Sequence, residues 1–141
     1  MILLDTNVVS EPLKASCDAG VLTWIDAQIV ETLYLSTISL AELRFGIAAL
    51  PTGKRQDMLR ASLEQRILPL FVGRILPFDA AASEAYAMLR ARARAEGKAI
   101  SPADGYIAAT AMAHGLIVAT RDTGPFEAAG LTVINPWNQG H

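Results

Sequence analysis

The sequence has 141 residues, of which 52% are hydrophobic, and 12 basic and 14 acidic residues give a formal net charge of −2. This length and apolar content predict one compact domain and exclude an intrinsically disordered chain. The near-neutral charge excludes a strongly basic nucleic-acid-binding protein. The single cysteine, Cys17, excludes an internal disulfide and a cysteine-based zinc cage. We therefore expect a soluble protein of the reducing cytoplasm, without a secretory signal or a membrane span.

In chain order, segments with strand and helix patterns alternate. The first half predicts a buried strand at Met1–Leu4, a helical turn or loop at Val8–Lys14, helices at Asp18–Gln28, Ser39–Leu50 and Lys54–Leu68, and extended segments at Leu33–Ser36 and Arg74–Phe78. The second half predicts a helix from the cap Asp79 to Gly97, a helix at Ser101–Gly115, a turn at Thr123–Pro125, and strands at Leu116–Ala119 and Leu131–Ile134. This alternation predicts an α/β fold, with helices on both faces of a central, mostly parallel twisted sheet.

Two of the apolar strands lead directly into polar residues. Asp5-Thr6-Asn7 follows Met1–Leu4, and Thr120-Arg121-Asp122 follows Leu116–Ala119. In open α/β sheets, ligands bind at the carboxyl ends of the strands, and parallel strands bring these ends to one edge. Glu42 and Asp104 lie in predicted first turns of helices. Topology alone therefore predicts that four carboxylates converge on one edge of the sheet: Asp5, Glu42, Asp104 and Asp122.

Three of these acids also have a purely structural interpretation. Ser39-Leu40-Ala41-Glu42 matches a capping box, in which the glutamate satisfies a free backbone donor of its helix. Asp104 follows a Ser-Pro helix start, where an acidic residue favours the helix dipole. Asp122 precedes Thr-Gly-Pro and fits a turn. Asp5 is harder to explain in this way, because a strand end that is buried on both sides rarely carries an unpaired acid.

A bound cation explains the predicted cluster better than three independent coincidences do. Carboxylates without basic partners repel one another unless their pKa values rise or a divalent ion binds. Oxygen ligands without histidine or cysteine favour hard cations, so we expect Mg²⁺ or Mn²⁺. No histidine stands in a motif for a general base, and His114 fits the end of a helix.

The motifs together resemble the PIN domain, and more closely the VapC-type toxins of type II toxin–antitoxin modules. Those that carry the resemblance are Met1–Asn7, Ala41-Glu42-Leu43, Pro102–Ala111 and Ala119–Asp122. The resemblance covers essentially the whole chain, implies a PIN-like three-layer α/β/α fold over residues 1–141, and implies a metal-dependent endoribonuclease. The family's acidic residues correspond to Asp5, Glu42, Asp104 and Asp122, and all four are present here. We expect Asp5, Asp104 and Asp122 to bind the metal, and Glu42 to bind it directly or through water.

The expected chemistry is cleavage of RNA phosphodiester bonds by metal-activated water. The resemblance places Thr6, Asn7 and Thr120 beside the metal as supporting residues, whereas Thr6 and Asn7 fit equally well as caps of the turn that follows. Among the basic residues, Lys98 and Arg121 are the better candidates for contacting RNA phosphates. Arg90 and Arg94 share one face of a predicted helix and Arg92 points elsewhere; we interpret all three as a solvated helix surface.

Partners are also implied by the resemblance. VapC-type toxins dimerise and are held by an antitoxin that often has a DNA-binding domain, so operator DNA is expected only through the antitoxin, and no membrane contact is expected. Helices Ser39–Leu50 and Lys54–Leu68 fit either a docking face or packing within the monomer. Two rival functions remain at this point. One is a nuclease-silent partner in a repressor complex; the other is a haloacid dehalogenase-type phosphatase, which would require an aspartate at Asn7.

Overall fold

Five parallel strands form one sheet within residues 1–139, the part of the chain that the computed structural model describes, in the order β3-β2-β1-β4-β5. They are β1 Ile2–Leu4, β2 Leu33–Ser36, β3 Ile75–Leu76, β4 Ile117–Ala119 and β5 Val133–Ile134. In the register of β1, Ile2 faces Leu33 of β2 and Leu4 faces Ala119 of β4. The predicted parallel sheet is confirmed, although the extended segment at Arg74–Phe78 contains a strand of only two residues.

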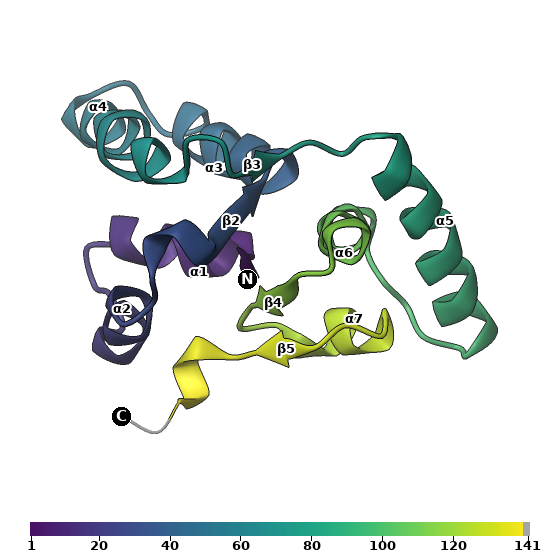
Figure 1. The fold of residues 1–141 in the computed structure, drawn as a ribbon. Helices are drawn as coiled ribbons and strands as arrows, with labels where there is room; N and C mark the ends of the chain where they lie inside the picture. The colour runs from purple at the N-terminus through teal and green to yellow at the C-terminus, as the bar shows by residue number, and fades with distance from the viewer. Residues whose placement is uncertain (140–141) are drawn as a thin grey trace.

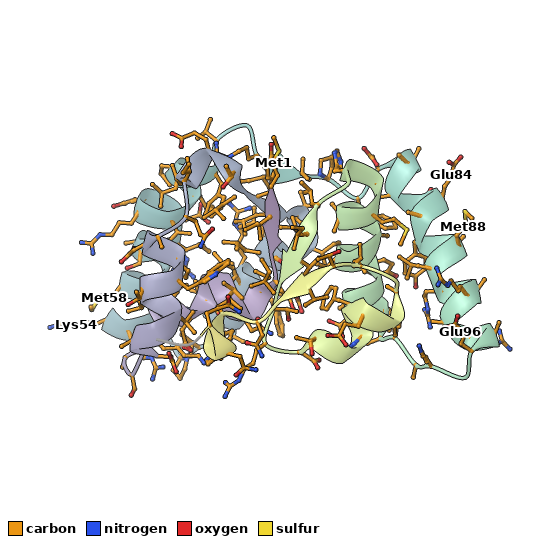
Figure 2. The ribbon with its side chains drawn as sticks, turned by 60° about the horizontal axis from the view of Figure 1, so that its bottom comes forward. Met1, Lys54, Met58, Glu84, Met88 and Glu96 are labelled. Carbon is orange, nitrogen blue, oxygen red and sulfur yellow. The ribbon has the colours of Figure 1, made fainter. Side chains whose placement is uncertain are left out.

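Helices cover both faces of this sheet (Figure 1). One layer contains α1 Thr6–Ser10, α2 Ala19–Asp26, α3 Thr37–Ala48 and α4 Lys54–Ala61, and the other contains α5 Ala80–Ala95, α6 Pro102–His114 and α7 Thr123–Ala128. Figure 2 shows Met58 of α4 and Met88 of α5 on opposite sides of the molecule. The residues of β1 alternate between the layers, because Ile2 and Leu4 pack in the core beneath α3 whereas Leu3 packs beneath α6. The predicted three-layer α/β/α architecture is confirmed.

Short helical turns connect these elements. Four are 3₁₀ helices, η1 Glu11–Leu13, η2 Val30–Thr32, η4 Leu68–Phe71 and η5 Pro136–Asn138, and η3 Ser62–Ile67 is a π-helical turn. The predicted helix over Lys54–Leu68 is helical throughout, but it is α-helical only as far as Ala61, where α4 ends and the π-helical turn begins. In the turn that follows, the amide of Leu68 donates to the carbonyl of Leu63, five residues back. Pro69 comes next and has no amide proton with which to continue a helical ladder.

Side-chain caps fix where several helices begin. Asp79 accepts a hydrogen bond from the amide of Ala82 at 3.0 Å, and Ser101 accepts one from the amide of Asp104 at 3.3 Å, as predicted. The predicted turn at Thr123–Pro125 is wrong, since these residues form the first turn of α7. Proline is tolerated there, because first-turn amides have no partner within the helix. None of the helices in residues 1–139 has the length and hydropathy needed to cross a membrane.

Candidate metal centre

Asp5 is a buried acid held in place at the carboxyl end of β1. Its side chain is 4% exposed. Its amide donates to the carbonyl of Ala119 at 2.9 Å, which extends the pairing of β1 with β4. One carboxylate oxygen, Oδ1, accepts from the amide of Thr6 at 2.8 Å, and Oδ2 accepts from the hydroxyl of Thr120 at 2.8 Å. The first residue of α1 and the residue that follows β4 therefore fix the position and orientation of this carboxylate.

Thr6 connects this carboxylate to α3. Its Oγ1 donates to Oε1 of Glu42 at 2.6 Å and lies 2.9 Å from Oγ of Ser39. Ser39 and Glu42 are three residues apart on α3, so both reach the same side of the helix. The first turn of α1 thus holds Glu42 at the same edge of the sheet as Asp5.

Thr120 organises the other side of the site. Its Oγ1 accepts from the amide of Asp122 at 3.1 Å and lies 3.4 Å from Nδ2 of Asn7. Oδ1 of Asn7 in turn accepts from the amide of Arg121 at 3.3 Å. Asp122 stands at the N-terminus of α7, but its side chain does not cap that helix. Its carboxylate therefore does not hydrogen-bond to the free amides at the start of α7.

Asp104 lies in the first turn of α6. Because β4 is parallel to β1, the helix that precedes β4 runs from the carboxyl edge of the sheet back to its amino edge, so α6 begins near the end of β1. Two acids lie close enough to Asp5 to affect its ionisation. Burial raises the pKa of Asp5 to about 6, and like-charge repulsion from Asp104 and Glu42 adds to the rise. Hydrogen bonds from Thr120 and from the amide of Thr6 act in the opposite direction. The negative charge of Asp5 is thus unfavourable unless a cation accompanies it.

Glu42 and Asp104 lie close enough to Asp5 for their charges to repel the charge of Asp5. The backbone amide of Asp122 is linked to the carboxylate of Asp5 through the hydroxyl of Thr120. Across residues 1–139, no three acidic, histidine or cysteine side chains are close enough together to form a metal-binding group as they stand. His114 is the last residue of α6, about 15 Å along the helix axis from Asp104, so it closes the helix as predicted.

The chemistry of these donors nevertheless fits a hard divalent cation. All the candidate ligands are carboxylate oxygens, which Mg²⁺ and Mn²⁺ prefer. None of the ion pairs within residues 1–139 involves Asp5, Glu42, Asp104 or Asp122. A buried acid with acidic neighbours and no basic partner is the arrangement that a bound cation stabilises.

Two structural interpretations of these acids are wrong. Glu42 does not belong to a capping box, because α3 begins at Thr37 and is capped by Ser36, which accepts from the amide of Ser39 at 3.0 Å. Glu42 therefore lies in the second turn of the helix. Ser39 was not predicted to take part in the site, although its sequence motif predicted a helix cap. Asp122 is not a turn residue, because a helix follows it.

A family model described as the PIN domain matches residues 2–131. The chain belongs to the PIN domain family, and its parallel sheet with acids at the carboxyl edge agrees with this assignment.

The chain is 64% identical over 137 residues to the VapC ribonuclease Y4jK of Sinorhizobium fredii, a match that covers 97% of this chain and 98% of that protein. It is 56% identical over 138 residues to Toxin FitB of Neisseria gonorrhoeae, covering 98% and 99% of the two chains. It also matches the structure of FitAB bound to an IR36 DNA fragment, with a TM-score of 0.96 and 54% identity over 100% of this chain and 99% of that one. These findings confirm the predicted resemblance: the protein is a homologue of VapC and FitB toxins.

Proposed function

We propose that this protein is a Mg²⁺- or Mn²⁺-dependent endoribonuclease, and that it is the toxin of a type II toxin–antitoxin module in the cytoplasm. The observation that carries the metal dependence is Asp5, an acid that is 4% exposed and has acidic neighbours. Y4jK, which is 64% identical, bears the name VapC ribonuclease. That likeness supports RNA as the substrate.

Each acid has a proposed role. Asp5 would be the central metal ligand, and Asp104 and Asp122 would be further ligands. Glu42 binds the metal directly or through a water molecule, in a position set by Thr6. A divalent cation bound at this site would lower the pKa of a bound water molecule and shield the negative charge of a phosphate group.

The other side chains orient these ligands. Thr120 and the amide of Thr6 each donate to one oxygen of Asp5, so the carboxylate keeps its orientation when it ionises. Asn7 accepts from the amide of Arg121 and fixes the segment that leads to Asp122. Arg121 is exposed, and its guanidinium lies 5.1 Å from the ring centroid of Trp137. Because Arg121 directly precedes Asp122 in the chain, we assign it to contact with an RNA phosphate next to the metal ligands.

The proposed partners are a cognate antitoxin and a second copy of the chain. The solved FitAB structure contains a DNA fragment. By analogy, we propose that this chain contacts operator DNA only through its antitoxin. On the predicted docking helices, Phe45 of α3 and Met58 of α4 are 74% and 68% exposed. These two apolar side chains favour a protein partner at that surface.

RNA cleavage by the purified protein tests the function. We expect cleavage that depends on Mg²⁺ or Mn²⁺, stops in EDTA, and is lost in Asp5→Asn and Asp104→Asn. Asp57→Asn is the matched control, because Asp57 is an exposed acid on α4, 3.8 Å from Arg60. Equal cleavage by wild type and Asp5→Asn would overturn the proposal, as would phosphate release from small phosphoesters without RNA cleavage.

Metal binding is measured separately from activity. Mn²⁺ should raise the thermal midpoint of the wild-type protein, because a ligand that binds only the folded state stabilises that state. At a free Mn²⁺ concentration a hundredfold above Kd, the free energy of unfolding increases by about 2.7 kcal/mol. Asp57→Asn should retain this rise and Asp5→Asn should lose it. An equal rise in Asp5→Asn would place the metal elsewhere.

A further inference from the structure

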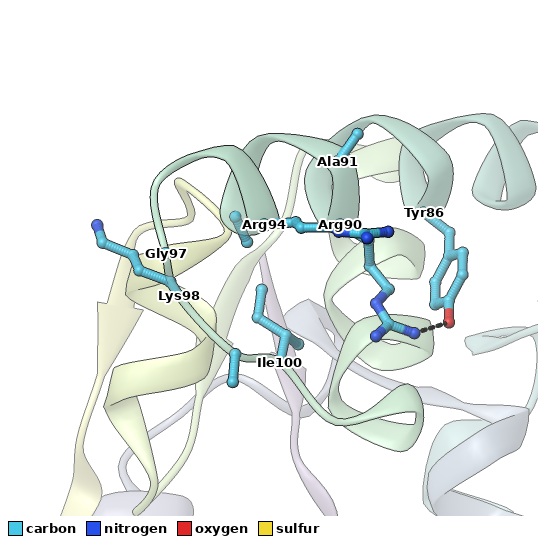
Figure 3. Close-up of a pocket in the computed structure, with 9 residues that line it drawn as sticks. Tyr86, Arg90, Ala91, Arg94, Gly97, Lys98 and Ile100 are labelled. Carbon is cyan, nitrogen blue, oxygen red and sulfur yellow. Dashed lines mark hydrogen bonds between the residues drawn. The ribbon is translucent and has the colours of Figure 1, made fainter.

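A basic pocket of about 680 Å³ lies between the C-terminal half of α5 and the segment that leads into α6 (Figure 3). Its lining residues are Tyr86, Arg90, Ala91, Ala93, Arg94, Gly97, Lys98, Ala99 and Ile100. Three of them are cationic and none is acidic, although the whole chain has a net charge of −2. The volume lies in the range of pockets that hold small ligands, roughly 300–1,000 Å³.

The pocket lies beside the helical turn that carries Asp104. Tyr86 and Arg90 pack against Gly105, the next residue along α6. A Cβ built on Gly105 would lie 2.9 Å from Cε2 of Tyr86 and 3.6 Å from Cδ of Arg90. From there, α5 continues through Arg94 towards Glu96, where the chain turns back to the start of α6 (Figure 2). The basic side chains therefore flank the edge of the sheet at which the candidate metal ligands gather.

The two arginines have charges that no acid in the described part of the chain neutralises. Within residues 1–139, neither Arg90 nor Arg94 takes part in an ion pair. Arg90 is held by a neutral group, since its Nη1 donates to the hydroxyl of Tyr86 at 2.7 Å (Figure 3). Lys98 lies 3.4 Å from a carboxylate oxygen of Glu96, and both side chains are largely exposed. Such an exposed pair is weak enough for an anion to compete with it.

The chemistry of the lining favours a phosphate over a nucleobase. A guanidinium presents paired donors that match the oxygens of a phosphate group. The only aromatic ring among the nine lining residues is Tyr86. It is already stacked on Tyr106, with ring centroids 4.8 Å apart, and Arg90 lies 5.5 Å from its centroid. Recognition in this pocket therefore depends on charge, which is the same in every nucleotide of a strand.

We propose that this pocket binds the backbone phosphates of the RNA strand that flank the scissile phosphate, through Arg90 and Arg94 with Lys98 at the rim. The inference rests on the proposed ribonuclease function, because it assigns the pocket to that substrate. It makes Arg90 and Arg94 positioning residues, which hold the strand across the Asp104 side of the site without touching the reacting bond.

The test is RNA binding by protein that cannot cleave. Fluorescence anisotropy of a labelled single-stranded RNA of mixed sequence is measured in EDTA with the Asp5→Asn protein, over a series of salt concentrations. Adding Arg94→Ala or Arg90→Gln should weaken binding, by about tenfold for Arg94→Ala, because each removes a charge-assisted hydrogen bond. The slope of log affinity against log salt should become shallower by about 0.7 for each phosphate contact removed.

Arg60→Ala is the matched control, since Arg60 is an exposed arginine on α4, in the opposite helical layer. Affinity and salt slope should both stay at the parent values in that variant. Equal affinities for the pocket variants and the control would overturn the inference. So would a loss of binding to double-stranded operator DNA, measured with the antitoxin complex, while RNA binding stayed intact.

Cleavage assays separate this inference from the function on which it rests. Wild-type cleavage of RNA together with unchanged binding by the pocket variants would reject the pocket alone. Weakened RNA binding by the pocket variants without any metal-dependent cleavage by wild type would reject the ribonuclease proposal alone. Thermal midpoints are recorded for every variant, because Arg90 also packs on Tyr86. A lower midpoint with an unchanged salt slope would assign Arg90 a structural role and overturn its place in the inference.

Discussion

The hydroxyl of Thr120 donates a 2.8 Å hydrogen bond to Oδ2 of Asp5, although the two residues are 115 positions apart in the sequence. They meet because β1 and β4 are adjacent and parallel, with Leu4 in register with Ala119, the residues just before them. Thr120 is fully buried, so water cannot replace its hydroxyl. The hydroxyl oxygen of Thr120 also accepts a hydrogen bond from the amide of Asp122. One side chain thus joins the two strand ends that carry candidate ligands.

Replacing Thr120 by valine should raise the pKa of Asp5 further. The hydroxyl is the strongest of the groups that lower this pKa, which burial has already raised to about 6. The acid limb of the pH–rate profile for RNA cleavage should therefore move to higher pH, and the protein should lose about 1–3 kcal/mol of stability, because buried partners lose their hydrogen bonds. The profile is measured at saturating RNA. Thr120→Ser should restore it.

Thr110→Val is the control for that experiment. Thr110 is equally buried, but its hydroxyl donates to the carbonyl of Tyr106 within α6, at 2.8 Å. This variant should leave the position of the acid limb unchanged. The same shift in both variants would contradict a specific effect of Thr120 on Asp5.

The stability of the metal-free protein should fall as pH rises, because the buried carboxyl group of Asp5 loses its proton. Its pKa is about 6 in the folded protein against a reference value of 3.8, so between these values the folded state binds more protons than the unfolded state. The free energy of unfolding therefore decreases over this window, by up to about 3 kcal/mol from this group, and stays lower above it. Asp5→Asn removes the ionisation, so its stability relative to wild type should increase by a similar amount.

Urea unfolding in EDTA at a series of pH values measures this difference. The unfolding free energies of wild type and Asp5→Asn should diverge as pH rises from about 4 to about 6. Curves that stay parallel across the window would contradict a raised pKa for Asp5. Asp57→Asn should run parallel to wild type, since Asp57 is exposed.

Thr6 should affect turnover through Glu42. Its hydroxyl donates to Oε1 of Glu42 at 2.6 Å, and valine at this position would leave that carboxylate free to rotate. We expect Thr6→Val to lower kcat about tenfold with little change in KM, since the interaction orients a ligand and does not bind RNA. Thr6→Ser keeps the hydroxyl and should retain most of the activity. A rise in KM with unchanged kcat would instead place Thr6 in RNA binding.

Gly105 should tolerate no side chain, because α5 and α6 approach closely there. A Cβ at this position would lie 2.9 Å from the ring of Tyr86, which the rings of Phe78 and Tyr106 hold in place. We expect Gly105→Ala to destabilise the protein by about 1–3 kcal/mol. Gly46→Ala on α3 is the control: a Cβ there has no neighbour within 4 Å, so it should stabilise by about 0.5–1 kcal/mol. Urea unfolding of both variants measures the difference, and equal effects would contradict a close contact at Gly105.

The sequence by itself determined the order of the elements and the type of sheet. Leu3, Leu4 and Val118 are at most 1% exposed, and apolar runs of that kind predict strands buried on both faces. The caps Asp79 and Ser101 were predictable as well, because a cap bonds an amide only three residues away. The polar residues that follow β1 and β4 could be placed at one edge of the sheet from the parallel topology alone.

Only the tertiary structure decided how those residues meet. The contact of Thr120 with Asp5 and the burial that raises the pKa of Asp5 both require two strands to pack side by side. The pocket at Arg94 likewise requires α5 to pack on Gly105 of α6. Short-range hydrogen bonds can be read from neighbouring residues, whereas burial and long-range contacts exist only once the helices and strands have packed together.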